Sequence, residues 1–164
     1  MRKLLMMISR AIINLVDDTK DVQTMQVDAL ADETHEDLEV FGLYGVGSNP
    51  PPGSEAIMAA VGGVRSNSVI IGVNNRTFRL VGLESGEVAL FDDVDQVVHL
   101  KRDGIYLSSP FKVEITAPNT QINGDLNCTG TITATTNVIG GGKSLKTHKH
   151  TGVTAGGSQT GEPA

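Results

Sequence analysis

The stretch "INGDLNCTGTITATTNV", residues 122–138, decides how the second half of this chain folds. Its odd positions are all polar, mostly Thr and Asn, and its even positions are apolar or small almost throughout. Alternation with a period of two indicates extended β structure with one buried face. Residues 105–117 alternate in the same way with the apolar residues at odd positions, and the phase reverses across residues 118–120, "PNT".

The extended segment of residues 122–138, called the ribbon below, needs partner strands that the chain itself does not offer. At about 3.3 Å per residue it would extend over about 60 Å, and the sequence contains no second segment of matching length. An unpaired edge and an apolar stripe would be left in water, whereas three copies around one axis close every edge. We therefore expect residues 105–140 to form one third of an intertwined, trimeric β-helix, within a stalk domain spanning residues 99–145. A narrow interior suits the small residues of the inward phase: Gly124, Cys128, Gly130 and Ala134.

A His-x-His pair lies beyond the ribbon, within residues 146–164, which we expect to form an apex. His148 and His150 are two residues apart, so in an extended segment they point to the same side. Three copies would bring six imidazoles to the axis, which makes an octahedral all-nitrogen site. Such a site suits iron(II) or another octahedral transition ion, whereas zinc prefers four ligands. The alternative is a mobile tail that contains two histidines by chance.

Residues 15–98 show the pattern of a compact all-β domain. Apolar runs recur roughly every eight to twelve residues, and turn signals such as the Pro-rich residues 49–53 separate them. This spacing favours a small barrel or sandwich, and the length matches an OB-fold-like barrel. Four aromatic residues lie in runs that we expect to be core: Phe41, Tyr44, Phe78 and Phe91.

Residues 1–14 are interpreted as an N-terminal helix or arm. The pattern predicts a short amphipathic helix over about residues 3–16, and a frayed start is the alternative reading. The apolar run of residues 4–8 is too short for a signal peptide or a membrane span.

The composition disfavours several classes of function. A net charge of −6 argues against a nucleic-acid partner and against electrostatic binding to an anionic membrane surface. The single cysteine, Cys128, excludes an intrachain disulfide and gives no zinc-ribbon pattern. His35 and His99 are isolated, and no Gly-rich phosphate loop precedes a helix. We therefore expect neither an enzyme nor a small-molecule substrate.

An OB-like domain, a Thr-rich ribbon and the ending "THKHTGVTAGGSQTGEPA", residues 147–164, together resemble the central spike of contractile phage tails. This is the baseplate assembly protein V family, which includes the phage Mu-type spike. The resemblance covers most of the chain, and the His-x-His pair with the closing Thr-Gly-x-Pro is its most specific part. It implies a homotrimeric needle whose apex holds one iron ion per trimer through six histidines, here His148 and His150 of each copy. It also implies that residues 151–164 fold back to sharpen the tip, closed by Thr160, Gly161 and Pro163.

The resemblance implies partners and a location as well. The OB-fold domain would seat the spike in the baseplate hub beneath the tail tube, and sheath contraction would drive the needle through the host outer membrane. The protein would assemble in the host cytoplasm and reside at the tip of the virion's tail baseplate. Some family members hold calcium and chloride along the spike axis, and the resemblance assigns no residue of this chain to them. The alternatives are a trimeric tail fibre or adhesin that binds a receptor, and an OB-fold nucleic-acid-binding protein.

Overall fold

The computed structural model describes residues 7–30, 33–152 and 156–157, and the chain divides into two units, Met1–Ile115 and Thr116–Ala164. Over the described ranges the protein is all-β, with antiparallel sheets and no α-helix, which confirms the predicted fold class. These same residues contain no helix that is long and apolar enough to span a membrane. The elements are β1 (Ile8–Asp17), β2 (Thr24–Asp28), β3 (Thr34–Glu39), β4 (Glu55–Ala60), the 3-10 turn η2 (Val61–Gly63), β5 (Ser68–Asn74), β6 (Val88–Phe91), β7 (Val97–Leu100), β8 (Ile105–Ser108), β9 (Ile139–Gly140) and β10 (Lys143–Ser144).

The strand β1 corrects the predicted N-terminal helix. The prediction of a helix over residues 3–16 is wrong where the structure describes it, and residues 1–6 lie outside the described ranges. β1 is the middle strand of its sheet, paired with β2 on one side and β4 on the other. This position and the β-branched pair Ile12-Ile13 outweigh the helical pattern. Every second residue of its first half is buried: Ser9, Ala11 and Ile13.

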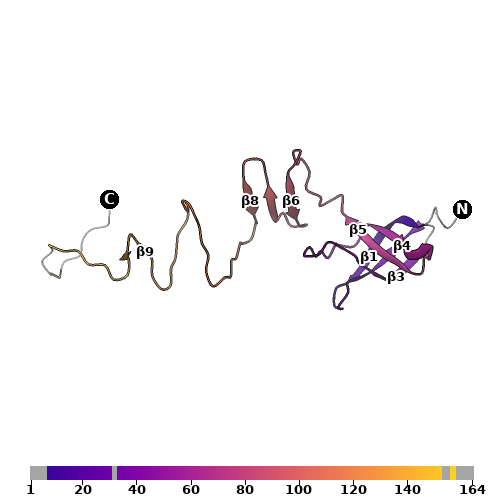
Figure 1. Cartoon of the computed structure of the whole chain (residues 1–164), viewed down its shortest axis with the longest axis horizontal. Helices are drawn as coiled ribbons and strands as arrows, with labels where there is room; N and C mark the ends of the chain where they lie inside the picture. The colour runs from indigo at the N-terminus through magenta and orange to yellow at the C-terminus, as the bar shows by residue number, and fades with distance from the viewer. Residues whose placement is uncertain (1–6, 31–32, 153–155, 158–164) are drawn as a thin grey trace. The chain divides into compact units, whose positions relative to one another are not determined.

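The first five strands form a sheet in the order β3-β2-β1-β4-β5 (Figure 1). Just beyond β3, Val40 forms a parallel bridge with Ile70 of β5. The next backbone amide, that of Phe41, donates a 2.8 Å hydrogen bond to the carbonyl oxygen of Ile70. The two outer strands therefore meet, and the sheet closes on itself around a core. The core residues are Ala11, Ile13, Met25, Val27, Leu38, Ala56, Met58 and Ile70.

Substituting Met58 by Ala should destabilise this core. The Met58 side chain is 1% exposed, and truncating such a buried side chain leaves a cavity, so we expect the free energy of unfolding to fall by about 2–5 kcal/mol. Urea denaturation followed by circular dichroism measures the change. Ile57→Ala is the matched control, because the neighbouring side chain in β4 is only partly buried and should cost less. Equal losses for the two variants would contradict the assigned orientation of β4.

The four aromatic residues predicted in the core are exposed instead, so that prediction is wrong. Their exposed fractions are 60% for Phe41, 106% for Tyr44, 41% for Phe78 and 44% for Phe91. For Phe41 and Tyr44 the reason is that β3 ends at Glu39 and the chain then runs as a loop, and for Phe78 it is that residues 76–83 form no strand. Phe91 is the last residue of β6, outside the core of the first sheet. Aliphatic and Met side chains fill the core without them.

The strands β6, β7 and β8 form a separate antiparallel sheet with an aliphatic face. Residues directly opposite each other in neighbouring strands point to the same side of a sheet. The register pairs Leu90 with Val98 and Val98 with Leu107. A second apolar row across the same three strands pairs Val88 with Leu100 and Leu100 with Ile105. The domain boundary expected between residues 98 and 99 falls inside β7. The residues of the aliphatic face are Val88, Leu90, Val98, Leu100, Ile105 and Leu107.

The ribbon between β8 and β9 forms no strand in the single chain (Figure 1). Every residue from 110 to 143 is exposed, including the inward-phase residues Leu126 at 68% and Ile132 at 66%. A strand needs a hydrogen-bonded neighbour, and one copy of the chain supplies none here. The β-helix therefore stays a prediction, and the single chain leaves the predicted apolar side of the ribbon uncovered.

Within residues 121–138 the backbone bends at regular intervals. The bends of this part of the ribbon lie at residues 123–124, 129–130 and 135–136, so they recur every six residues. The sequence repeats with them as "QINGDL", "NCTGTI" and "TATTNV", each ending in an aliphatic residue. A period of two does not reveal this hexad repeat, which becomes visible when residues 121–138 are aligned in sixes.

Candidate metal site

A tight hairpin precedes the histidine pair. β9 and β10 pair antiparallel, with Ser144 opposite Ile139. Gly141 and Gly142 connect the two strands with φ values of 55° and 76°. Two successive residues with positive φ make the two-residue turn that matches the twist of a hairpin, and glycine adopts it without strain. The triple glycine therefore reverses the chain just before the apex.

The His148 ring is held by the turn that follows this hairpin. Its backbone amide donates a 3.0 Å hydrogen bond to the carbonyl oxygen of Ser144. Its Nδ1 lies 3.1 Å from that same oxygen and 3.1 Å from the carbonyl oxygen of Leu145. A carbonyl oxygen can only accept, so Nδ1 carries the proton and donates it. In the neutral ring the lone pair then resides on Nε2, which is the state in which imidazole binds a metal.

The structure places the His148 and His150 rings side by side. Their centroids are 5.1 Å apart and the ring planes meet at 78°, so the rings are not stacked face to face. Both residues are exposed. Two neutral imidazoles are a suitable donor pair for a borderline transition ion such as iron(II), so the residues present fit part of the expected site.

One chain does not complete this site. Within the described ranges, no group of three or more His, Cys, Asp and Glu side chains gathers in one place. A metal ion at His148 and His150 would need its other ligands from further copies of the chain. The predicted closing residues Thr160, Gly161 and Pro163 lie outside the described ranges, and Asp125 and Cys128 are exposed.

The other two histidines are each paired with a glutamate. His35 Nε2 lies 3.3 Å from Glu33 Oε1, and His99 Nε2 lies 3.1 Å from Glu87 Oε2. The pKa of Glu33 is lowered mainly by its hydrogen bond to Arg65, and the pKa of Glu87 mainly by the backbone amide of Glu84. Each contact joins a strand histidine to a glutamate that lies just before a strand. Within the described ranges, neither histidine belongs to a group of three or more His, Cys, Asp and Glu side chains that could hold a metal ion.

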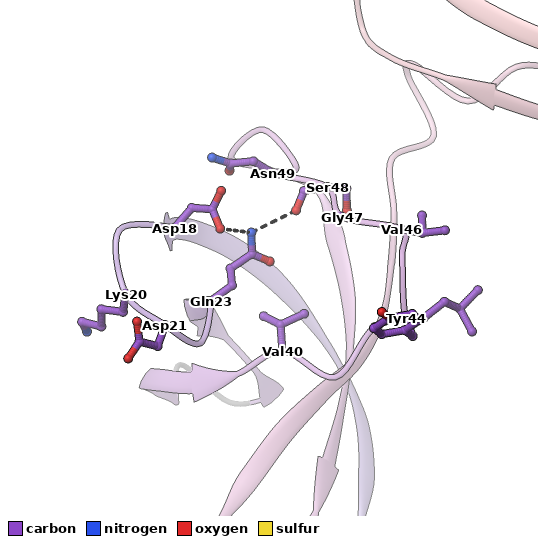
Figure 2. Close-up of a pocket in the computed structure, with 12 residues that line it drawn as sticks. Asp18, Lys20, Asp21, Gln23, Val40, Tyr44, Val46, Gly47, Ser48 and Asn49 are labelled. Carbon is purple, nitrogen blue, oxygen red and sulfur yellow. Dashed lines mark hydrogen bonds between the residues drawn. The ribbon is translucent and has the colours of Figure 1, made fainter. Parts of the chain in front are cut away.

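A pocket of about 690 Å³ in the first unit presents no catalytic arrangement (Figure 2). Gln23 Nε2 donates to Asp18 Oδ1 and to the carbonyl oxygen of Ser48, both at 3.0 Å, and so ties the loop after β3 to the turn after β1. The lining holds two aspartates and one lysine but neither histidine nor cysteine. The lining residues are Asp18, Lys20, Asp21, Gln23, Val40, Gly42, Leu43, Tyr44, Val46, Gly47, Ser48 and Asn49.

Comparison with known proteins adds an independent observation. A family model described as "Bacteriophage Mu Gp45, N-terminal" matches residues 10–77, and one described as "GpV Apex motif" matches residues 144–164. The baseplate puncturing device gp45 of Escherichia phage Mu is 31% identical over 176 residues, which cover 95% of this chain and 89% of the phage Mu protein. The chain belongs to the phage Mu Gp45 family. This confirms the family resemblance seen in the sequence.

A second relative in the Gp45 family is the Mu-like prophage FluMu protein gp45 of Haemophilus influenzae. It is 31% identical over 163 residues, which cover 91% of this chain and 88% of the relative. The N-terminal family match runs from β1 past the end of β5. The apex match begins at Ser144, the residue whose carbonyl oxygen accepts from the His148 ring.

Two features of the structure were missed by reasoning from the sequence. The aliphatic face of β6–β8 depends on cross-strand register, which the individual runs do not show. The side chains of Asn137 and Ser144 hold the turn before His148. Nothing in the sequence indicates this role except that the two residues lie on either side of the Gly-rich hairpin. The hexad repeat, in contrast, could have been found by aligning the ribbon with itself.

Proposed function

We propose that this protein is the membrane-puncturing spike of a contractile phage tail, a homotrimeric needle that sheath contraction drives through the host outer membrane. Membership of the Gp45 family carries this proposal, because the phage Mu relative is named a baseplate puncturing device. The needle resides at the baseplate tip of the virion and is assembled in the host cytoplasm. The function is mechanical and non-enzymatic.

The uncovered apolar surfaces support a homotrimer. The aliphatic face of β6–β8 includes Ile105 at 75% and Leu90 at 58% exposed, and large contiguous apolar patches on soluble proteins mark interaction surfaces. The odd-numbered apolar phase of β8 continues in Phe111, Val113 and Ile115, which are also exposed. One continuous stripe thus runs from the sheet into the ribbon, and we assign it to contacts with two further copies of the chain.

The hexad repeat supports threefold geometry. A bend every six residues suits a chain that crosses one face of a three-sided prism and then turns onto the next. The three hexads of residues 121–138 would carry each chain once around the axis. Each hexad would then form its ladder with hexads of the other two copies, which accounts for the missing intrachain partner.

The N-terminal sheet supports a docking role in the baseplate. Its order β3-β2-β1-β4-β5, closed by the parallel bridge between Val40 and Ile70, supports the five-stranded OB-fold-like barrel expected from the sequence. We assign this barrel to contacts with baseplate hub and tail tube proteins. Nucleic-acid binding is disfavoured by the net charge of −6.

At the apex, His148 and His150 of three copies would together hold one iron ion through six imidazoles. The ion would supply a cross-link between the three chain ends, at the point where fraying of the needle would begin. The two carbonyl oxygens near Nδ1 of His148 favour the tautomer that leaves Nε2 available. Calcium and chloride on the axis stay a family expectation to which we assign no residue.

Tails that carry a chain truncated after Gly142 test the function. We expect them to attach to cells and to contract normally, but to permeabilise the outer membrane less, because the ribbon remains while the tip is lost. Electron microscopy scores attachment and contraction, and uptake of a hydrophobic dye excluded by an intact outer membrane scores puncture. Loss of attachment would favour the receptor-binding fibre instead, and unchanged dye uptake would contradict the role of the apex.

A further inference from the structure

A chain of hydrogen bonds links Asn137, the fifth residue of the last hexad, to the His148 ring. The Ser144 hydroxyl donates to Asn137 Oδ1 at 3.0 Å, and the same oxygen accepts from the Lys146 amide at 3.3 Å. The Ser144 Oγ in turn accepts from the Thr147 amide at 3.1 Å. The carbonyl oxygen of Ser144 then accepts both the backbone amide and the Nδ1–H of His148.

Ser144 also differs from its neighbours in burial. Among residues 110–152, Ser144 alone is partly buried, while all the others are exposed. Its side chain uses its donor and its acceptor capacity at once, toward Asn137 before the hairpin and toward Thr147 after it. A hydroxyl that bonds on both sides of a turn restricts that turn more than either bond alone would.

We propose that Asn137 and Ser144 are positioning residues, which hold the turn so that the His148 ring keeps its proton on Nδ1 and presents Nε2 to a metal ion. This inference rests on the proposed apex site. Groups that accept the second ring N–H of a ligating histidine fix its tautomer and orientation and increase its basicity as a ligand. Here the accepting groups are backbone carbonyls, so the two side chains act by placing those carbonyls.

The ring tautomer in metal-free protein tests the proposal directly. We expect ring-nitrogen NMR shifts of the full-length wild type at alkaline pH to show His148 mainly as the Nδ1–H form. Ser144→Ala and Asn137→Ala should shift the population toward the Nε2–H form, which free imidazole side chains prefer. Ser144→Thr keeps the hydroxyl and should restore the wild-type spectrum. Thr147→Ala is the matched control, because it removes a hydroxyl from the same turn while leaving its amide bond to Ser144 in place.

Metal affinity provides the second readout. With iron(II) as the probe under anaerobic conditions, Ser144→Ala should raise the dissociation constant about 10–100-fold, while native mass spectrometry still shows the same oligomer. Unchanged tautomer and affinity in both alanine variants would overturn the positioning role. If the wild type binds no iron, the apex site of the proposed function fails, and the tautomer measurement still decides whether the turn controls the ring.

Discussion

Deleting one whole hexad, residues 127–132, should leave a stable trimeric spike, whereas deleting only residues 129–132 should strongly destabilise the trimer. Both deletions preserve the alternation of apolar and polar positions, because each removes an even number of residues. Only the first preserves the six-residue spacing of the bends. A β-helix built from hexads should tolerate the loss of one whole hexad, because the remaining hexads of each chain still cross one face of the three-sided prism each.

The shorter deletion leaves the bends at residues 123–124 and 135–136 eight positions apart instead of a multiple of six. The ladder beyond the deletion would then lose its register in all three chains. At about 1 kcal/mol per hydrogen bond, the loss over residues 133–138 amounts to on the order of 10 kcal/mol per trimer. Native mass spectrometry at fixed chain concentration distinguishes trimer from monomer. Equal behaviour of the two variants would mean that a period of two is sufficient and that the hexad has no structural role.

Replacing both His148 and His150 by Ala should remove the bound metal and leave the trimer intact. We expect the metal content of untagged protein, measured by plasma mass spectrometry, to fall from about one iron per three chains to none. In the proposed site each copy contributes two of the six ligands, so the double substitution removes all six. The trimer should persist because the ribbon and the aliphatic face of β6–β8, rather than the metal, hold the copies together.

Lys149→Ala is the control for the histidine substitutions. It changes the residue between the two rings without removing an imidazole, and it should keep the metal. A monomeric double-histidine variant would show that the metal and not the ribbon assembles the spike. A wild-type protein with no stoichiometric metal would remove the apex argument and favour the fibre interpretation.

Alternation along the chain predicted most strands of the first unit. Met25 and Val27 alternate with polar residues in the sequence, and both are buried. β1 was missed because its apolar residues are so frequent that a helical stripe and a strand face fit equally well. What identifies it as a strand is its central place between β2 and β4, which is a property of the whole sheet and not of residues 8–17.

The second unit was predictable in a different way. Its alternation predicted an apolar side, and Leu126 and Ile132 of that side are exposed in the single chain. The hairpin at Gly141-Gly142 was not predicted, because nothing in a run of glycines distinguishes a turn from a flexible linker. The tautomer of His148 could not be predicted at all, since it depends on where two backbone carbonyls lie.

The self-closing sheet and the uncovered ribbon assign the two parts of the chain to different kinds of folding reaction. The sheet of β1–β5 buries its core within one chain, so its folding is unimolecular and independent of concentration. Residues 110–143 are exposed in the single chain, so in the proposed trimer their ordering would require an encounter between chains and would depend on concentration. Chains with a folded first sheet and an unpaired ribbon would then precede finished spikes. The concentration of newly made chains would set how soon spikes accumulate.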